Sequence, residues 1–310
     1  MTAIQVEQNV NRALLPKTGI SSKTQAVLAI LCSAFFFAVM NAMSRQAGEL
    51  PVAQKCFFRN IVAIPIAALA LWREAPDGEI VRHNMPGLLL RAVLGTLGMT
   101  ANFYAVDHML LADATILSRL SPFATLLLSW WFLGERLSRL QAGSVVIAFL
   151  GALCIIRPGA AILASAPALI GLLGGIATGA AYTTVRWLSQ RGVGQSVIVF
   201  AYSFVSCLLM LPQLIFAYCP MTSRQLMYLL LAGLASACAQ FCLTSGYAKA
   251  PSREISAYEY TTVIFAAVLG FIMFGQIPDC FSWLGYGIII GVAVLVFWYN
   301  RRQEKSLEDR

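Results

Sequence analysis

The stretch from Ala112 to Gly134, ADATILSRLSPFATLLLSWWFLG, decides the fold class of this 310-residue chain. It is long enough to cross a bilayer, because about 20 predominantly apolar residues span the hydrocarbon region. A stripe of polar residues and a proline recurs along it at steps of three and four, with Arg119 at the edge of the stripe. The stripe consists of Thr115, Ser118, Pro122, Thr125 and Ser129. We expect it to face a protein interior or water, and we expect Pro122 to kink the helix.

The composition of the whole chain agrees with a membrane protein. It is 59% apolar and only 12% charged, with a mean hydropathy of +0.73, whereas soluble domains are roughly 25% charged. Because backbone groups in lipid must satisfy their own hydrogen bonds, each long apolar run predicts a helix. We therefore expect an all-α membrane protein with ten transmembrane helices. The runs are 25–44, 53–72, 86–106, 112–133, 140–157, 167–187, 195–218, 225–247, 254–275 and 281–299.

The distribution of basic residues accounts for the net charge of +8 without a nucleic-acid partner. Most of the 22 lysines and arginines fall in alternate loops and in the two tails, residues 1–24 and 300–310. Such loops face the cytoplasm under the positive-inside rule. We expect a multi-pass protein of the cytoplasmic (inner) membrane with both termini in the cytoplasm.

An internal repeat organises the chain into two halves, 25–158 and 166–299. A shift of 141 residues places Arg45 on Arg186 and Gly134 on Gly275, and each half then has five runs with matching breaks. Because five is an odd number, the second half must enter the membrane from the opposite side. We therefore predict two inverted five-helix repeats, with a site near the membrane midplane where they meet.

Four stretches resemble an EamA-type transporter of the drug/metabolite transporter superfamily. They are FFRN at 57–60, RAVLGTLGMTANFYA at 91–105, LADATILSRLSPFATLLLSWWFLGERLSRLQAGSVVIAFLGALCIIRP at 111–158 and APSREISAYEYTTVIFAAVLGFIMFGQIPDCFSWLGYGIIIG at 250–291. The resemblance implies a ten-helix inner-membrane transporter whose cavity is lined mainly by the first, third, fourth, sixth, eighth and ninth helices. It also implies substrates such as amino acids, S-adenosylmethionine or riboflavin. The sequence departs from the family pattern at Gln276, where the family has an acid, although the first repeat keeps Glu135.

Glu259 is the strongest candidate for a site residue, because a carboxylate within a spanning helix usually has a partner or a function. It aligns with Ser118 in the first repeat. A desolvated carboxyl group can bind a cationic part of a substrate, or take and release a proton near neutral pH. The alternative is a permanent ion pair with Arg119 or Arg59 that only locks the helices together.

The other substrate-binding candidates are polar residues within the apolar runs. Arg119 has the geometry to hold a carboxylate or phosphate, whereas Arg59 lies nearer the outer end of its helix and can place its charge at the membrane surface. For the remaining candidates the alternative is ordinary hydrogen bonding between helices. They are Ser118, Asn41, Tyr104, Tyr182, Gln240, Tyr258 and Tyr260.

These patterns predict a secondary transporter of a small polar metabolite, monomeric or homodimeric, with no cofactor and no metal site. Alternating access at the midplane would move the solute, with proton coupling through Glu259 as one energy source. The unequal halves favour a substrate of mixed charge, such as an amino-acid-like or nucleotide-derived zwitterion. A non-transporting scaffold or sensor is the first alternative, and a cavity sealed by bulky side chains would favour it. An intramembrane enzyme is the second, and it lacks the expected residue constellation, since His83 and His108 both fall in loops.

Overall fold

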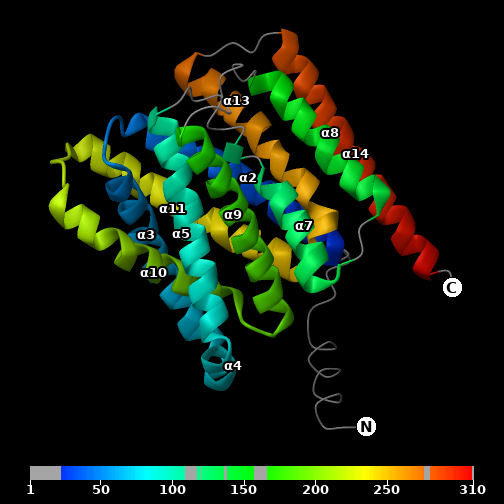
Figure 1. Cartoon of the computed structure of the whole chain (residues 1–310), viewed down its shortest axis with the longest axis horizontal. Helices are drawn as coiled ribbons and strands as arrows, with labels where there is room; N and C mark the ends of the chain where they lie inside the picture. The colour runs from blue at the N-terminus through cyan, green and yellow to red at the C-terminus, as the bar shows by residue number, and fades with distance from the viewer. Residues whose placement is uncertain are drawn as a thin grey trace.

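The computed structural model describes residues 22–108, 117–118, 120–135, 138–156, 166–275 and 280–308. These ranges are predominantly helical and contain no strand (Figure 1). The helices of the first half are α2 (Ser22–Gln46), α3 (Val52–Glu74), the short α4 (Gly78–His83), α5 (Met85–His108), α7 (Ser121–Leu133) and α8 (Arg139–Ile156). Those of the second half are α9 (Ala166–Gln190), α10 (Gln195–Phe216), α11 (Ser223–Lys249), α12 (Ser252–Ile255), the 3₁₀ segment η2 (Ser256–Tyr260), α13 (Thr261–Phe274) and α14 (Cys280–Glu308).

The prediction of a helical membrane protein is confirmed. Seven described segments are long and apolar enough to cross a membrane. Three shorter apolar helices, Ser121–Leu133, Ala142–Gly151 and Trp283–Tyr299, fall within three further predicted runs. The number of spans stays a prediction.

The helices pack in a pattern that the 141-residue shift reproduces. α2 packs against α11 and α13, and its counterpart α9 packs against α5 and α7 (Figure 1). α3 pairs with its own counterpart α10, and α8 pairs with its counterpart α14. The two halves also match in detail, since α7 and α13 end at Gly134 and Gly275 in the same left-handed conformation, with φ of 64° and 63°.

The described part of the fourth predicted run includes Leu117, Ser118 and then α7, which begins at Ser121. Pro122 therefore lies in the first turn of α7, where a missing backbone N–H costs nothing. The kink expected at Pro122 stays a prediction, because Arg119 and residues 109–116 lie outside the described residues. The polar stripe does face the interior, because Pro122, Thr125 and Ser129 are buried while Trp131 is 73% exposed. Thr115 lies outside the described residues.

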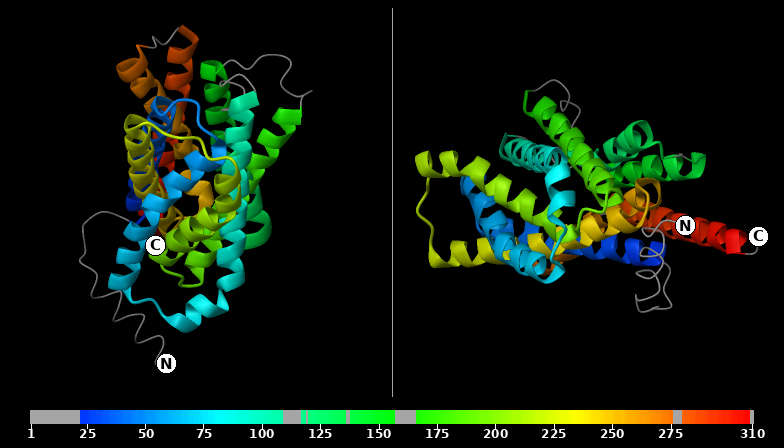
Figure 2. Two further views of the ribbon diagram at one scale, coloured as in Figure 1. Left: turned by 90° about the vertical axis from the view of Figure 1, so that its left-hand side faces the viewer. Right: turned by 90° about the horizontal axis from the view of Figure 1, so that it is seen from below.

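The ninth predicted run is also interrupted. It consists of α12, the 3₁₀ turn η2 and then α13, and Glu259 lies within the turn. The break in this run and the start of α7 occupy matching positions in the two halves. The last helix, in contrast, is longer than expected: α14 continues to Glu308 through much of the predicted tail, and Figure 2 shows its C-terminal part projecting beyond the other helices.

Glycines on α9 allow the two halves to approach closely. A methyl group at Gly175 would lie 2.4 Å from the carbonyl oxygen of Leu117. One at Gly179 would lie 2.7 Å from the carbonyl oxygen of Ser121 and 2.8 Å from the backbone nitrogen of Thr125. Because these neighbours are backbone atoms, they cannot yield as a flexible side chain would. Gly175 and Gly179 therefore serve close packing between the helices.

We predict that Gly179→Ala destabilises the protein by about 1–3 kcal/mol, because the added methyl group overpacks the contact between α9 and α7. Gly291→Ala is the matched control: a methyl group on α14 at that position meets nothing within 4 Å, and alanine is the better helix former by up to about 1 kcal/mol. Thermal unfolding of the detergent-purified protein measures both. Equal midpoints for the two variants would contradict the packing role.

Candidate functional site

A cavity of about 150 Å³ lies between the two halves. Part of its wall is made of small residues, including Gly95 and Gly98 on α5 and Gly174 on α9. Polar and charged side chains from nine elements line the rest, namely α2, α3, α5, α7, α9, α10, α11, η2 and α13. The interior of the bundle is therefore both hollow and polar, which a purely structural core does not require.

Two arginines form the basic side of the cavity. Arg59 on α3 is 6% exposed and Arg91 on α5 is 2% exposed. Nη2 of Arg59 donates to the hydroxyl of Tyr202 at 2.7 Å, and Nη2 of Arg91 donates to Oε1 of Gln240 at 3.1 Å. The guanidinium carbon of Arg91 also lies 4.3 Å from the centre of the Tyr202 ring, within cation–π range. Tyr202 on α10 thus contacts both arginines.

The arginines keep several donors without acceptors. Nε of Arg59, and Nε and Nη1 of Arg91, are buried and have no hydrogen-bond partner among the described residues. Within the same part of the chain, neither guanidinium contacts a carboxylate. Buried cations without a counter-charge are costly, so this side of the cavity is chemically incomplete as it stands.

Glu259 forms the acidic side of the cavity. It is 9% exposed, and its carboxylate accepts a hydrogen bond from the hydroxyl of Tyr247 on α11. The 3₁₀ turn of η2 places Glu259 beside Tyr247, which is fully buried and packs against the ring of Tyr182. Arg59 bonds to Tyr202 and not to Glu259, so the described contacts do not contain the Arg59–Glu259 pair that the sequence left open.

The structure gathers part of the predicted set around the cavity. Ser118, Asn41, Tyr182, Gln240 and Glu259 all line it. Three predicted tyrosines lie elsewhere: Tyr104 stacks on His108, Tyr258 is buried beside α12, and Tyr260 packs edge-to-face on Phe123. Arg119 lies outside the described residues, so its position stays a prediction.

The sequence alone did not single out three residues of the site. Arg91 lies more than one turn inside α5, which begins at Met85. An arginine at that depth is itself a signal, because charge within a membrane helix is rare. Tyr202 and Tyr247 carry no comparable signal, since tyrosines in apolar runs are more often packing residues.

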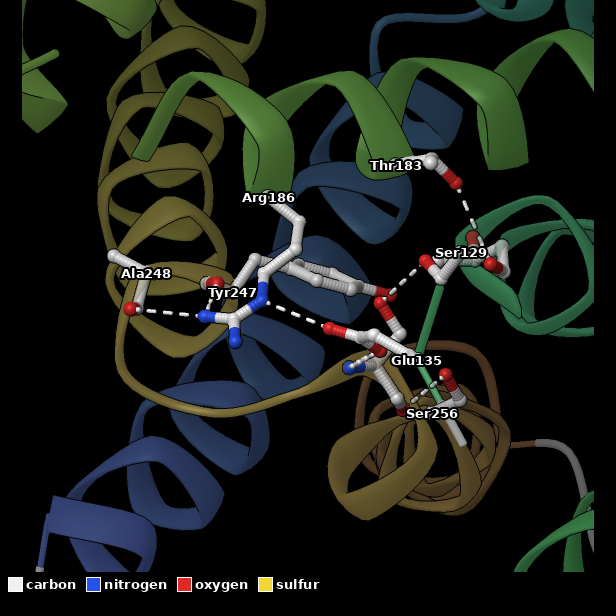
Figure 3. Close-up of polar contacts among 9 residues, drawn as sticks. Ser129, Glu135, Thr183, Arg186, Tyr247, Ala248 and Ser256 are labelled. Carbon is white, nitrogen blue, oxygen red and sulfur yellow. Dashed lines mark hydrogen bonds and ion pairs between the residues drawn. The ribbon is translucent and has the colours of Figure 1, made fainter. Parts of the chain in front are cut away.

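A second polar cluster lies at the ends of four helices (Figure 3). Nε of Arg186, near the end of α9, is 3.1 Å from Oε1 of Glu135, just after α7. Nη1 of Arg186 also donates to the carbonyl oxygens of Tyr247 and Ala248 near the end of α11, at 3.1 and 3.2 Å. Both charges are largely buried, with side chains 13% and 9% exposed.

The other oxygen of Glu135 extends the cluster to the ninth predicted run. It accepts a hydrogen bond from the backbone nitrogen of Ser252 at 3.1 Å, and the hydroxyls of Ser129 and Ser252 lie 2.8 Å apart. The cluster therefore joins α7, α9, α11 and α12. Tyr247 belongs to both groups, because its hydroxyl contacts Glu259 and its carbonyl oxygen contacts Arg186.

Comparison with known proteins agrees with this architecture. Residues 24–157 and 166–298 match the EamA-like transporter family. The pseudopaline exporter CntI of Pseudomonas aeruginosa is 34% identical over 275 residues, 88% of this chain and 95% of that protein. A riboflavin transporter of Rhizobium johnstonii is 26% identical over 218 residues, 70% of this chain and 72% of that protein. A solved crystal structure of a protein shares the fold, with a TM-score of 0.78 at 14% identity over 89% of this chain and 98% of that one.

The helical fold, the polar cavity and these relatives define a membrane transporter. The chain belongs to the EamA-like transporter family, which matches both of its halves.

We predict that Tyr247→Phe lowers the free energy of unfolding by about 1–3 kcal/mol, because the buried carboxylate of Glu259 loses a donor. Tyr258→Phe is the control: its hydroxyl is buried without a partner among the described residues, so its removal should be neutral or slightly stabilising. Thermal unfolding of the detergent-purified variants measures the difference. A Tyr258→Phe variant as unstable as Tyr247→Phe would show that the lost bond is not the cause.

Proposed function

We propose that the protein is a secondary active transporter, or exchanger, that moves a small polar organic metabolite across the cytoplasmic membrane by alternating access. The observation that supports this most directly is the polar cavity between the two halves, lined by Arg59, Arg91 and Glu259. Transporter sites typically lie near the midplane where two repeats meet. The proposed repeats span 25–158 and 166–299, with ten transmembrane helices, inverted orientation and both termini in the cytoplasm.

The packing pattern supports the inverted-repeat proposal. α2 and α9 exchange roles under the 141-residue shift, as do α5 and α11, while α3–α10 and α8–α14 are pairs of counterparts. An approximate two-fold axis relates elements in this way when it passes between counterparts. The interrupted α12–η2–α13 run beside the cavity is also typical of transporter sites, where broken helices expose polar groups to the substrate.

The small volume of the cavity supports a mechanism in which the two halves of the protein move apart. At about 150 Å³ it is smaller than ligand pockets, which usually enclose roughly 300–1,000 Å³. A metabolite therefore needs the halves to separate before it enters. In our proposal the Arg186–Glu135 cluster closes the cytoplasmic end of the cavity, and its four helix ends must part when that end opens.

The two ends of the proposed cycle are chemically unequal. The shift of 141 residues places Arg45 on Arg186 but replaces the acid of Glu135 by Gln276, which lies outside the described residues. A glutamine cannot form the corresponding ion pair. We infer that closure of the cytoplasmic end is held more tightly than closure of the opposite end.

The names of the relatives indicate a direction of transport and candidate classes of substrate. Because CntI is an exporter and matches 88% of this chain, we propose export as the direction of transport. The sequence favours zwitterions such as amino-acid-like compounds or S-adenosylmethionine, and one relative is named for riboflavin. The protein would act as a monomer or homodimer in the inner membrane without a nucleic-acid partner.

The two alternative functions explain fewer of the observations than transport does. A scaffold or sensor needs no polar cavity between its halves, whereas Arg59, Arg91 and Glu259 line one here. An intramembrane enzyme has no support from the family or from the relatives, which are transporters.

Reconstitution tests transport and its coupling together. Proteoliposomes loaded with a mixture of metabolites should release at least one solute faster than protein-free vesicles. We predict that an imposed pH gradient accelerates this release. Glu259→Gln should remove the acceleration, because an amide neither gains nor loses a proton near neutral pH. Mass spectrometry of the external medium measures both. Unchanged acceleration in Glu259→Gln would refute coupling through Glu259, and an absence of any release would refute transport.

We also predict that Arg186→Gln opens the cytoplasmic end. In a cysteine-free background carrying Ser118→Cys in the cavity, a maleimide reagent added to inside-out vesicles should label the variant at least tenfold faster than the parent. Arg191→Gln is the control, since Arg191 lies just beyond the same helix but stacks on Trp187 outside the cluster. Equal labelling rates in Arg186→Gln and the control would show that the ion pair does not close the cavity.

A further inference from the structure

Two buried guanidinium groups on one side of the cavity have no carboxylate in contact with them among the described residues. Arg59 and Arg91 come from different helices, and neither contacts a carboxylate within the described part of the chain. Placing an isolated cation inside a membrane protein is costly, and such groups normally pair or serve a substrate path. Two of them at one cavity wall therefore indicate a site whose missing component is anionic.

Tyr202 contacts the guanidinium groups of both Arg59 and Arg91 and positions them at the cavity wall. Its ring face packs on the guanidinium of Arg91, and its hydroxyl accepts a hydrogen bond from Arg59. Both arginines also keep N–H groups without acceptors, namely Nε of Arg59 and Nε and Nη1 of Arg91. Each guanidinium can thus donate to an anionic group of its own, while the tyrosine holds the pair in place.

Gly95 provides the room for this arrangement. A methyl group at position 95 would lie 2.1 Å from Nη1 of Arg91 and 2.9 Å from the ring of Tyr202. A larger residue at that position would displace the guanidinium of Arg91 from its place beside the tyrosine ring. The close approach therefore holds a guanidinium group that contacts Gln240 and Tyr202 but no carboxylate among the described residues.

We propose that Arg59 and Arg91 form a carboxylate clamp, and that the transported solute is an organic acid with at least two carboxylates. This inference rests on the proposed function and sharpens its substrate class. Guanidinium groups match carboxylates because their planar donors form paired, charge-assisted hydrogen bonds. Two carboxylates in one solute neutralise both arginines, whereas a solute with a single carboxylate leaves one of them buried and uncompensated.

Thermal shift of the purified full-length protein tests the class with matched probes. Glutarate and glutamate each carry two carboxylates, and glutamine differs from glutamate by one amide. We expect glutarate and glutamate to raise the unfolding midpoint, with apparent affinities roughly tenfold to hundredfold tighter than that of glutamine. Inorganic phosphate is the remaining probe, and stabilisation by phosphate but not by glutarate would overturn the proposal.

Variants separate a binding role from a structural one. Arg59→Gln and Arg91→Gln should each abolish the advantage of glutarate over glutamine. Because each removes an uncompensated charge, the unfolding midpoint without probe should stay the same or rise. Arg73→Gln, an exposed position on the same helix as Arg59, is the control and should keep the full advantage. A fall in the midpoint without probe, with the glutarate advantage intact, would assign the arginines a structural role and overturn the clamp.

The reconstituted system distinguishes failure of the clamp from failure of the proposed function. If the clamp is right, the solutes released from metabolite-loaded proteoliposomes carry two or more carboxylates, and Arg91→Gln slows their release at least tenfold. Release of neutral or monocarboxylate solutes at equal rates by wild type and Arg91→Gln would overturn the clamp while leaving transport intact. Absence of any release by the folded wild type would overturn the proposed function and the clamp with it.

Discussion

The cost of placing charge inside a membrane-spanning bundle governs the interior of this protein. Arg59, Arg91 and Glu259 all lie on apolar runs, and lipid cannot solvate any of them. The bundle responds by turning all three toward one cavity, where Tyr202, Gln240 and Tyr247 supply hydrogen bonds. Gly95 on α5 contributes to this arrangement, because it leaves room for the guanidinium of Arg91 and the ring of Tyr202.

The packing of the two halves and the chemistry of the cavity are connected through the interrupted ninth run. A continuous α-helix satisfies its own backbone, whereas a short 3₁₀ segment directs side chains differently and leaves polar groups near the cavity. η2 does this at Glu259, and α7 begins at the matching position in the first half. The same segment leads back through α12 to Ser252 and the Glu135 carboxylate. A change at the cavity is thereby linked to the cluster at the helix ends through very few residues.

Tyr247 is the shortest of these links. Its hydroxyl donates to Glu259 in the cavity, and its carbonyl oxygen accepts from Arg186 in the ion-pair cluster. A change of charge on Glu259 therefore acts on a residue that also contacts the Arg186–Glu135 cluster. A transporter needs such a connection, because occupancy of its substrate site and closure of one end of its cavity must depend on each other. No separate relay has to be assumed.

The sequence by itself determined the class of the protein. Apolar runs of spanning length fixed the helices, because a backbone in lipid has few alternatives, and a period of 141 residues revealed the two halves. It also marked Glu259, Tyr182, Asn41, Gln240 and Ser118, because polar residues within such runs are conspicuous. The tertiary structure decided which polar residues share a cavity, since that depends on how each helix is rotated and where it is broken. Contacts between helices that are distant in the chain place Arg91 beside Tyr202. They place Tyr258 and Tyr260 away from the cavity.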